Sequence, residues 1–447
     1  MQKKWMLPIL ALSMMAMAFL GCSNDDNSDT EGGGEATPSP STTESRGAIY
    51  LTDKPVGYAS IEGSYKTSGG KTVRTSAELR SALSGGGVII IDGMIDMSDG
   101  RLVAAGKKST DSTTALDNFV KSNSSYTTYS AWVEAYSKAC KLTTEDDKAG
   151  ATDGTGNSSL QSVMKKLNDA YGKIIRLDLQ SNTTLIGKGP GCGIRGGTIQ
   201  ISGKSNIQIR NLTIQDPFDP FPHHEANDGY NAQWDGVNIQ GTSKNIWIDH
   251  CTFEDTIDLG YVNTNGSSQE KWQTYDGLCD MKGDSTNITV SNCVFKNHDK
   301  TMLIGSSDSD GDNSKRFVTL YGNYFYNCGQ RLPMVRNTTI HILNNYYDAS
   351  NPHYANSYAV GVRENAIIYA ENNYFGSGIK YSFSNNDGEV YASGNGGSKS
   401  GTMNKTKISG STLFKDAVGK YDYTAVSADA AKTNAEKNAG AGYTLNL

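Results

Sequence analysis

The chain has 447 residues and a formal net charge of −6, and it contains 49 glycines and 24 tyrosines against 11 phenylalanines. This length suits one large all-β domain or two ordinary domains. The acidic balance argues against a nucleic-acid-binding protein, because such proteins usually present a basic stripe. An acidic protein that acts on a polyanion needs local positive charge or a bridging metal ion.

The first 22 residues have the pattern of an export signal. Two lysines precede an apolar stretch over residues 5–20, as in secretory signals. Gly21-Cys22 then resembles the end of a bacterial lipoprotein signal, although Phe19 stands where leucine is usual. We therefore expect an exported protein that contacts the membrane only through a lipid on Cys22, at the cell surface or outer membrane. An ordinary cleaved signal, and secretion, is the alternative.

The next segment has the composition of a flexible tether. Residues 23–47 are rich in Gly, Ser, Thr and Pro, which disfavours a packed structure. We expect the flexible segment to continue to residue 65 and one folded domain to cover residues 66–447.

Three helical patterns precede the main part of this domain. SAELRSALSG predicts a short helix with Ser76 as N-cap and Gly85 as its stop, and VIIIDGMIDM after it predicts a first strand. A helix in this place would cap the open end of a solenoid. Residues 98–180 then interrupt the strand pattern, and helical patterns at Ala131–Cys140 and Leu160–Tyr171 predict a helical insertion.

A repeat occupies the rest of the chain, as in NIQIRNLTIQD, NIWIDHCTFED and NITVSNCVFKN. The shortest interval between equivalent large residues, Phe325 to Tyr347, is 22 residues. One turn of a parallel β-solenoid needs about that many, and extra residues become loops. The pattern predicts an all-β, right-handed parallel β-helix. The units align on Ile214, Phe253, Phe295, Phe325, Tyr347 and Phe375.

Asparagines and cysteines recur at fixed places in these units. Asparagine tolerates left-handed backbone and can hydrogen-bond to the next coil, so we expect both roles at the bends. No CxxC pair occurs, and we interpret Cys251 and Cys293 mainly as stacked, buried thiols. The asparagines concerned are Asn211, Asn292, Asn345 and Asn373.

Three carboxylates fall near equivalent places in adjacent units. Asp235 precedes one strand, and Asp276 and Asp280 precede the next. Adjacent coils lie about 4.8 Å apart, so these groups would repel one another without a cation. Oxygen ligands without histidine or cysteine point to Ca²⁺. Solvated loop aspartates are the alternative.

Cations follow on later coils. Lys300 and Arg331 lie on successive later coils and can flank the same face, and Arg336 follows Arg331. Cations beside a Ca²⁺ site suit an anionic substrate. For each residue alone, a surface ion pair is the alternative. Trp272 and Tyr275, in the loop before Asp276, are candidates for stacking on sugar rings.

Four motifs, in this order, resemble those of the extracellular pectate lyases of polysaccharide lyase family 1. They are WIDHCTF, DGLCDMKGDSTNITVSN, HDKTMLIGSSD and RLPMVR. The resemblance covers roughly residues 70–390 without the insertion. It implies a right-handed parallel β-helix that cleaves polygalacturonate by Ca²⁺-dependent β-elimination. We expect such a protein to act as a monomer.

The same resemblance assigns roles to single residues. Gln233 stands where some members carry a further acidic residue, which removes one charge from the metal site. Arginine normally stays protonated, so an arginine base implies activity that rises above neutral pH. The implied Ca²⁺ ligands are Asp235, Asp276 and Asp280, the substrate ligands Lys282, Lys300 and Arg336, and the base Arg331.

Other solenoid functions make different demands. A polygalacturonase would need paired catalytic acids near the groove, but the Asp-Asp pairs of this sequence lie in the insertion and the tether. A pectin lyase, acting on methylated substrate, would lack the Ca²⁺ carboxylates. A non-catalytic pectin-binding solenoid could keep the groove and Ca²⁺ without needing Arg331.

Overall fold

The computed structural model describes residues 45–108, 110–141, 158–225, 229–257, 272–351, 353–385, 387–405, 407–410 and 420–447. The expected signal, the lipidation residue Cys22 and residues 23–44 of the tether lie outside these ranges. Within them, no helix is long and apolar enough to cross a bilayer.

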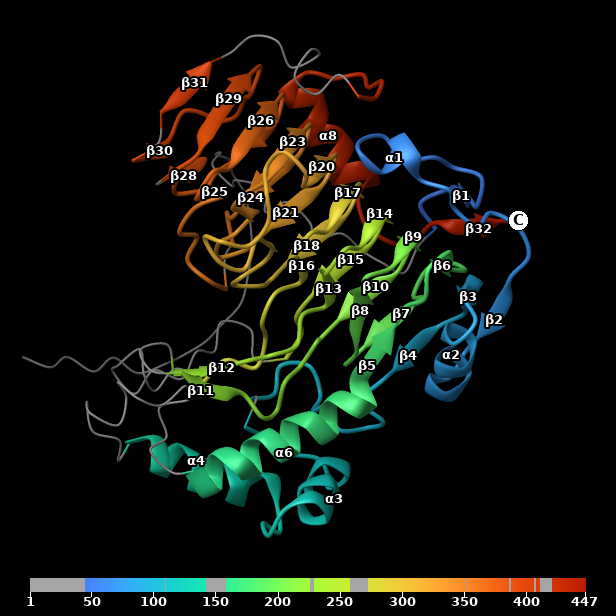
Figure 1. Ribbon diagram of the computed structural model, residues 1–447, viewed down its shortest axis with the longest axis vertical. Helices are drawn as coiled ribbons and strands as arrows, with labels where there is room; N and C mark the ends of the chain where they lie inside the picture. Colours follow the sequence, from blue (N-terminus) through green and yellow to red (C-terminus); the bar gives the residue numbers. More distant parts are fainter. Residues whose placement is uncertain are drawn as a thin grey trace, which may run out of the picture. The chain divides into compact units, whose positions relative to one another are not determined.

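The chain winds into a right-handed parallel β-helix with three long sheets (Figure 1). An eight-stranded sheet contains β4 (Met94–Asp96), β7 (Gly193–Arg195), β10 (Thr213–Gln215), β15 (Thr252–Glu254), β18 (Val294–Lys296), β21 (Tyr324–Tyr326), β24 (Tyr346–Asp348) and β27 (Tyr374–Phe375). A nine-stranded sheet contains β5 (Arg176–Asp178), β8 (Thr198–Ser202), β13 (Val237–Gln240), β16 (Cys279–Met281), β19 (Leu303–Ile304), β22 (Met334–Val335), β25 (Val360–Val362), β28 (Phe383–Asn385) and β30 (Met403–Asn404). An eleven-stranded sheet contains β2 (Lys71–Val73), β3 (Gly87–Ile91), β6 (Thr183–Gly187), β9 (Ser205–Arg210), β14 (Lys244–Asp249), β17 (Thr286–Ser291), β20 (Phe317–Tyr321), β23 (Thr339–Leu343), β26 (Ile367–Glu371), β29 (Glu389–Ser393) and β31 (Ile408–Gly410).

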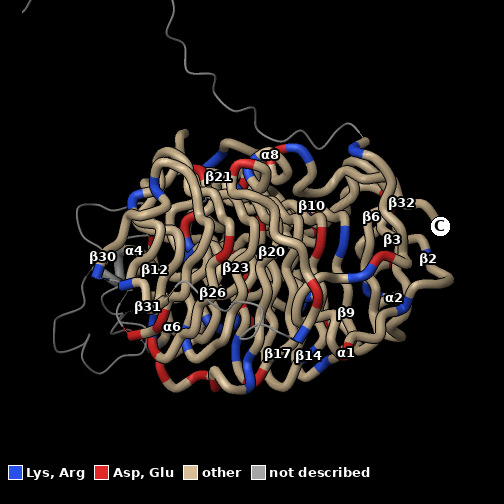
Figure 2. The backbone as a smooth tube through the Cα atoms, turned by 90° about the horizontal axis from the view of Figure 1, so that it is seen from above, with Lys and Arg blue, Asp and Glu red and all other residues tan. Residues whose placement is uncertain are grey.

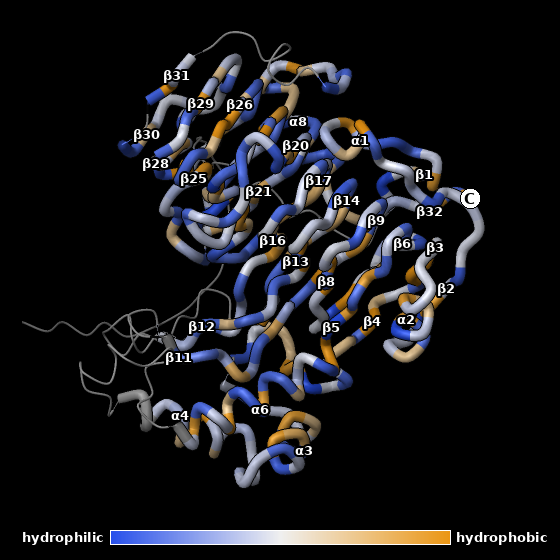
Figure 3. Tube along the Cα trace, in the orientation of Figure 1, coloured by the Kyte–Doolittle hydropathy of each residue, from blue (hydrophilic) through white to orange (hydrophobic). Residues whose placement is uncertain are grey.

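The predicted alignment of the repeats is confirmed in the eight-stranded sheet. Ile214 pairs with Phe253, and each later member of the set pairs with the next. The rings of Phe253 and Phe295 stack at 4.8 Å, and those of Tyr347 and Phe375 at 4.7 Å. These residues form part of one continuous apolar core inside the coil, and hydrophobic residues follow the strands (orange in Figure 3).

At the bends, two neighbouring residues share the roles that the sequence predicted for a single asparagine. One adopts the left-handed backbone conformation, and the other forms the hydrogen bond to the next coil. Asn211 and Asn292 adopt left-handed φ angles of 53° and 49°. In later coils this conformation belongs to Asn344, one residue before Asn345, with φ 55°. Asn345 instead points inward, where its Nδ2 donates to Asn373 Oδ1 at 3.0 Å. The backbone turns at one residue and the ladder forms at the next.

The N-terminal cap differs in detail from the prediction. Helix α2 spans Ser76–Leu83, and its N-cap is Thr75, not Ser76, because Thr75 and Glu78 form a reciprocal capping box. The predicted first strand is two strands, β3 and β4, in different sheets. The chain turns between them at Gly93, whose φ is 102°.

Residues 45–65 do not form a free tether. Strand β1 (Ala48–Tyr50) pairs in parallel with β32 (Thr444–Asn446). Helix α1 (Ala59–Glu62) lies on the eleven-stranded sheet, where the backbone N–H groups of Tyr58 and Ala59 donate to Thr319 and Thr289 at 3.1 Å. These hydrogen bonds to buried threonines hold the segment against the coil. The composition of the segment alone does not indicate this attachment.

The predicted helical insertion is present and has its own aromatic core. It contains α3 (Thr114–Asn123), which was not predicted, α4 (Tyr129–Lys141) and α6 (Ser158–Ile175). Their core includes Phe221, Tyr230 and Trp272 from loops of the β-helix, and Tyr230 belongs to the hairpin β11 (His223–Glu225) and β12 (Gly229–Asn231). Trp272 is 2% exposed and Tyr275 8%. Both are therefore packing residues, not the exposed sugar platforms that their loop position allowed.

The C-terminal part first continues the coil and then runs back along it. Strands β30 and β31 extend two of the sheets. Helix α8 (Ala428–Asn438) packs Ala435 against Tyr324 and Tyr346 of the eight-stranded sheet. The C-terminal helix therefore packs along the outside of the solenoid.

The described cysteine side chains are free and buried. They are Cys192, Cys251, Cys279, Cys293 and Cys328. The backbone N–H of Cys251 donates to Cys293 Sγ at 3.4 Å, as expected for stacked thiols in successive coils. The side chain of Cys140 lies outside the described residues.

Candidate active site

The predicted charged residues meet at one end of neighbouring strands in the nine-stranded sheet. Asp235 lies just before β13, Asp276 before β16, Lys300 before β19 and Arg331 before β22. These strands are consecutive neighbours and pair in parallel, so their starts lie side by side. Charges of both signs are interspersed over the described chain (Figure 2), and this row brings opposite signs together on one sheet.

Two of the carboxylates form ion pairs with the same lysine side chain. Lys282 Nζ lies 2.9 Å from Asp235 Oδ2 and 3.3 Å from Asp280 Oδ2. Backbone N–H groups fix the other oxygens, since Gly277 donates to Asp235 Oδ1 at 3.0 Å and Leu303 to Asp280 Oδ1 at 2.9 Å. A Cβ at Gly277 would lie 2.2 Å from Asp280 Oδ1. The DGLCDMK motif therefore needs its glycine for this close approach.

Burial makes these carboxylates costly to ionise. Burial, and then repulsion from Asp280 and Asp276, raises the pKa of Asp235 well above its ordinary value. Burial also raises the pKa of Asp280, with Lys282 opposing the rise. Burial lowers the pKa of Lys282, but the two carboxylates outweigh it and raise that pKa overall. The arrangement therefore favours a positive charge between the acids.

Asp276 is held by its side chain and by its backbone. Lys300 Nζ lies 3.3 Å from Asp276 Oδ1 and donates to Asn231 Oδ1 at 2.6 Å. His298 Nε2 lies 2.7 Å from the carbonyl oxygen of Asp276. The HDK motif thus contacts Asp276 with two residues, of which sequence reasoning used only the lysine.

His298 is in turn oriented by a buried acid. Its Nδ1 lies 2.6 Å from Asp255 Oδ2, and the two side chains are 1% and 0% exposed. Burial lowers the pKa of His298, but Asp255 more than offsets this and raises it overall. Burial raises the pKa of Asp255 to about 6. Both ring nitrogens face acceptors, so this histidine orients the Asp276 backbone through a fixed hydrogen-bond chain.

The two arginines of RLPMVR have different surroundings. Arg331 adopts a left-handed φ of 59°, and among the described residues its Nε has no hydrogen-bond partner. It lies close enough to Asp280 to favour the ionised carboxylate there. Arg336, just after β22, bonds Asp308 Oδ1 at 2.8 Å through Nε. Asp308 is 75% exposed, so this pair lies at the surface, where exchange for another carboxylate costs little.

The donor set fits a hard cation such as Ca²⁺. Within the described ranges, no group of three or more acidic, histidine or cysteine side chains is arranged to hold a metal ion by itself. However, the Lys282 ammonium group shows that oxygens of Asp235 and Asp280 already converge on one positive charge. Carboxylate oxygens are the ligands that Ca²⁺ prefers, with water or substrate completing its shell.

The fold and this row of charges define the class, a parallel β-helix protein with acids and bases gathered on one sheet. The sequence matches the family model described as "Pectate lyase" over residues 141–444. The chain belongs to the pectate lyase family.

Comparisons with individual proteins also find pectate lyases. Pectate lyase E of Dickeya dadantii is 40% identical over 206 residues, which are 45% of this chain and 50% of that protein. The chain thus spans about half the length of the curated relatives it matches. A solved pectate lyase bound to a hexasaccharide has a TM-score of 0.68 at 26% identity, over 88% of this chain and 97% of that one. A structure described for the substrate specificity and anti β-elimination mechanism of pectate lyase has the same TM-score and identity, over 89% and 99%.

Proposed function

We propose that this protein is a pectate lyase that cleaves α-1,4-linked polygalacturonate by Ca²⁺-dependent β-elimination and leaves 4,5-unsaturated ends. The gathering of Asp235, Asp276, Lys300 and Arg331 at the starts of four neighbouring strands carries the proposal. Membership of the pectate lyase family supports it. So does the similarity to a pectate lyase bound to a hexasaccharide.

The substrate carboxylate is bound by Lys300 and Arg336. Charged donors form strong hydrogen bonds to carboxylates, and Arg336 exchanges its surface partner Asp308 for the substrate. Asp235, Asp276 and Asp280 would hold Ca²⁺. A bound Ca²⁺ would stabilise the negative charge that develops on the substrate when the C5 proton is removed. The predicted contact of Lys282 with substrate stays a prediction. Its ammonium group is engaged by Asp235 and Asp280, so we propose that it orients these ligands.

Arg331 acts as the base. It takes the proton from C5, the C5–H electrons form the C4–C5 double bond, and the C4–O bond breaks. The departing oxygen takes a proton from solvent, so no water is added across the bond.

The test is the near-ultraviolet absorbance of polygalacturonate incubated with signal-free protein, with Ca²⁺ and with excess chelator. We expect a Ca²⁺-dependent rise that increases above neutral pH and falls roughly 10²–10⁴-fold in Arg331→Ala. Arg176→Ala, in strand β5 of the same sheet and 44% exposed, should retain the rise. New reducing ends without absorbance would indicate a hydrolase, and binding without product would indicate a pectin-binding solenoid.

We also propose that the protein is exported, carries a lipid on Cys22 and acts as a monomer. The Gly21-Cys22 signal pattern supports the lipid. Labelling of the full chain with a fatty-acid probe should be lost in Cys22→Ala. Labelling that persists in this variant would contradict the anchor.

A further inference from the structure

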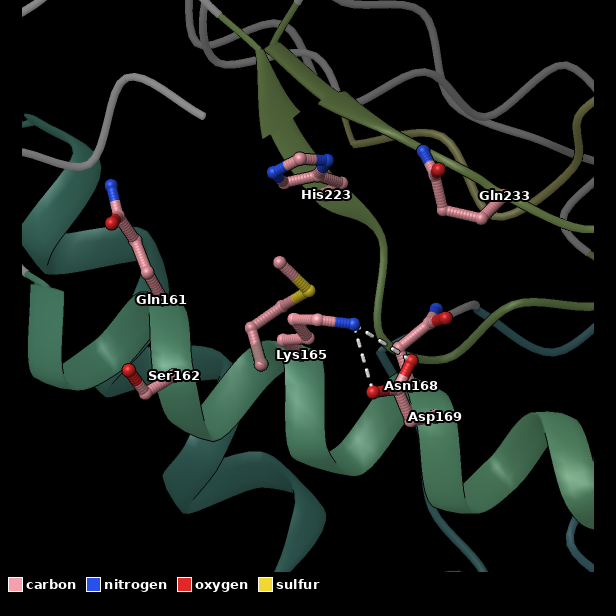
Figure 4. A pocket seen from close by; sticks show the side chains of 8 residues that line it. Gln161, Ser162, Lys165, Asn168, Asp169, His223 and Gln233 are labelled. Carbon is pink, nitrogen blue, oxygen red and sulfur yellow. Dashed lines mark hydrogen bonds and ion pairs between the residues drawn. The ribbon is translucent and has the colours of Figure 1, made fainter. Parts of the chain in front are cut away.

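The helical insertion forms one wall of a polar cavity beside the candidate active site. The cavity has a volume of about 490 Å³, within the range of small-molecule sites. Helix α6 provides one wall, and His223 of β11 and Gln233 face it across the cavity (Figure 4). Its lining residues are Gln161, Ser162, Met164, Lys165, Asn168, Asp169, His223 and Gln233.

Buried hydrogen bonds hold the two walls together. Asn168 Nδ2 on α6 donates to both oxygens of Asp219 at 3.1 and 3.0 Å. Asp219 also accepts from the backbone N–H of Gln233 at 2.9 Å. Tyr129 Oη on α4 donates to the carbonyl of Pro220 at 2.9 Å. The cavity is therefore a fixed part of the fold, because its walls share one bonded core.

A short piece of chain links the lining of the cavity to the candidate active site. Gln233 lies two residues before the carboxylate Asp235, and its Nε2 donates to the carbonyl of Asn231 at 3.2 Å. The side chain of Asn231 accepts from Lys300. A polysaccharide bound at Lys300 thus has a further polar site within reach along its own length.

The chemistry of the lining differs from that of the candidate active site. Lys165 and Asp169 form an ion pair at 2.9 Å, shown by dashed lines in Figure 4. With histidine counted as neutral, the other lining side chains named for this cavity are amides, a hydroxyl, an imidazole and a thioether. Amides and hydroxyls match sugar hydroxyls, and a balanced charge gives no preference for a carboxylate.

We propose that this cavity is a subsite for an uncharged sugar unit of pectin, one whose carboxyl group is esterified or absent. This inference rests on the proposed function of the neighbouring site. Anionic units would occupy the row of Lys300 and Arg336, while the helical insertion selects for an uncharged unit further along the chain. The insertion would thereby set which partly esterified substrates the protein prefers.

The test measures binding and turnover separately. Ser162→Trp fills the cavity from α6, and Gln161→Trp fills it from a second position. Lys166→Trp, exposed on the same helix and outside the lining, is the control. In an Arg331→Ala background, calorimetry compares methyl-esterified, de-esterified and neutral-sugar oligosaccharides of equal length.

We expect the ratio of affinities for esterified over de-esterified oligosaccharide to fall roughly tenfold in both filling variants and to stay unchanged in the control. The same ratio in kcat/KM should fall in the active background. A loss for the neutral oligosaccharide alone would assign the subsite to neutral sugars. An unchanged ratio in both filling variants would overturn the subsite. If the wild type forms no unsaturated product, the lyase proposal fails, and the binding ratios still decide the role of the cavity.

Discussion

The ammonium group of Lys282 lies between two buried carboxylates, which would otherwise repel each other. Removing one partner of a buried charge network is costly, about 3–5 kcal/mol. We therefore expect Lys282→Met to lower the melting temperature in chelator, and added Ca²⁺ to restore part of the loss. Lys315→Met, whose side chain is 80% exposed, is the matched control. An equal, small effect in both variants would contradict this role.

Substitution of His298 tests whether the backbone of Asp276 must be fixed for metal binding. Residues that orient ligands typically change metal affinity by about 10–100-fold when replaced. We expect His298→Leu to weaken Ca²⁺ binding by about tenfold or more in a calorimetric titration, and His298→Gln to recover part of it through its amide N–H. His250→Gln, whose histidine bonds Asp249 instead, should keep the affinity. Unchanged affinity in His298→Leu would show that the contact is structural only.

At the scale of the element, the asparagine ladder joins the coils. Asn345 Oδ1 accepts from the backbone and side chain of Asn323, both at 2.9 Å, and its Nδ2 donates to the carbonyl of Leu320. Asn345→Ala removes these buried hydrogen bonds, each of which contributes about 0.5–1.5 kcal/mol net. We expect the free energy of unfolding to fall by about 2–3 kcal/mol in a urea titration.

Asn351→Ala, at an exposed position, controls for the substitution itself. If both variants unfold at the same urea concentration, the ladder does not stabilise the coil.

At the scale of the whole molecule, one buried network ties the N-terminal segment to two coils. Arg210 on β9 donates to the carbonyl of Tyr50 at 2.8 Å, to Asp53 at 3.0 Å and to Asp249 at 3.2 Å. Burial alone would raise the pKa of Asp249, but His250 and Arg210 outweigh it and hold that pKa below its ordinary value. A depressed pKa stabilises the fold above the unfolded value of about 3.9, and this stability is lost as the pH falls below it.

We expect Asp249→Asn to lower the melting temperature at neutral pH, with a difference from wild type that shrinks as the pH falls below about 4. Asp178→Asn, a 59% exposed aspartate paired with Arg176, should show a much smaller difference. A difference that is constant from neutral to acidic pH would argue against the charge of Asp249 as its cause.

The sequence by itself determined the coil and the order of its charged residues. Apolar alternation and the large residue at each rung depend on local pleating and on stacking of equivalent positions, so periodicity revealed the register of Phe253 on Phe295. Because every coil repeats the same geometry, charged residues that precede equivalent strands are expected to lie side by side. That reasoning placed Asp235, Asp276, Lys300 and Arg331 together.

Only the tertiary structure decided what each polar group contacts. The pairing of Lys282 with two carboxylates, the His298 contact to Asp276 and the packing of Trp272 join segments that the coil brings together in space. The attachment of residues 48–62 and the cavity beside α6 depend on loops of irregular length. Periodicity carries no information about such contacts, because they arise where the repeat is interrupted.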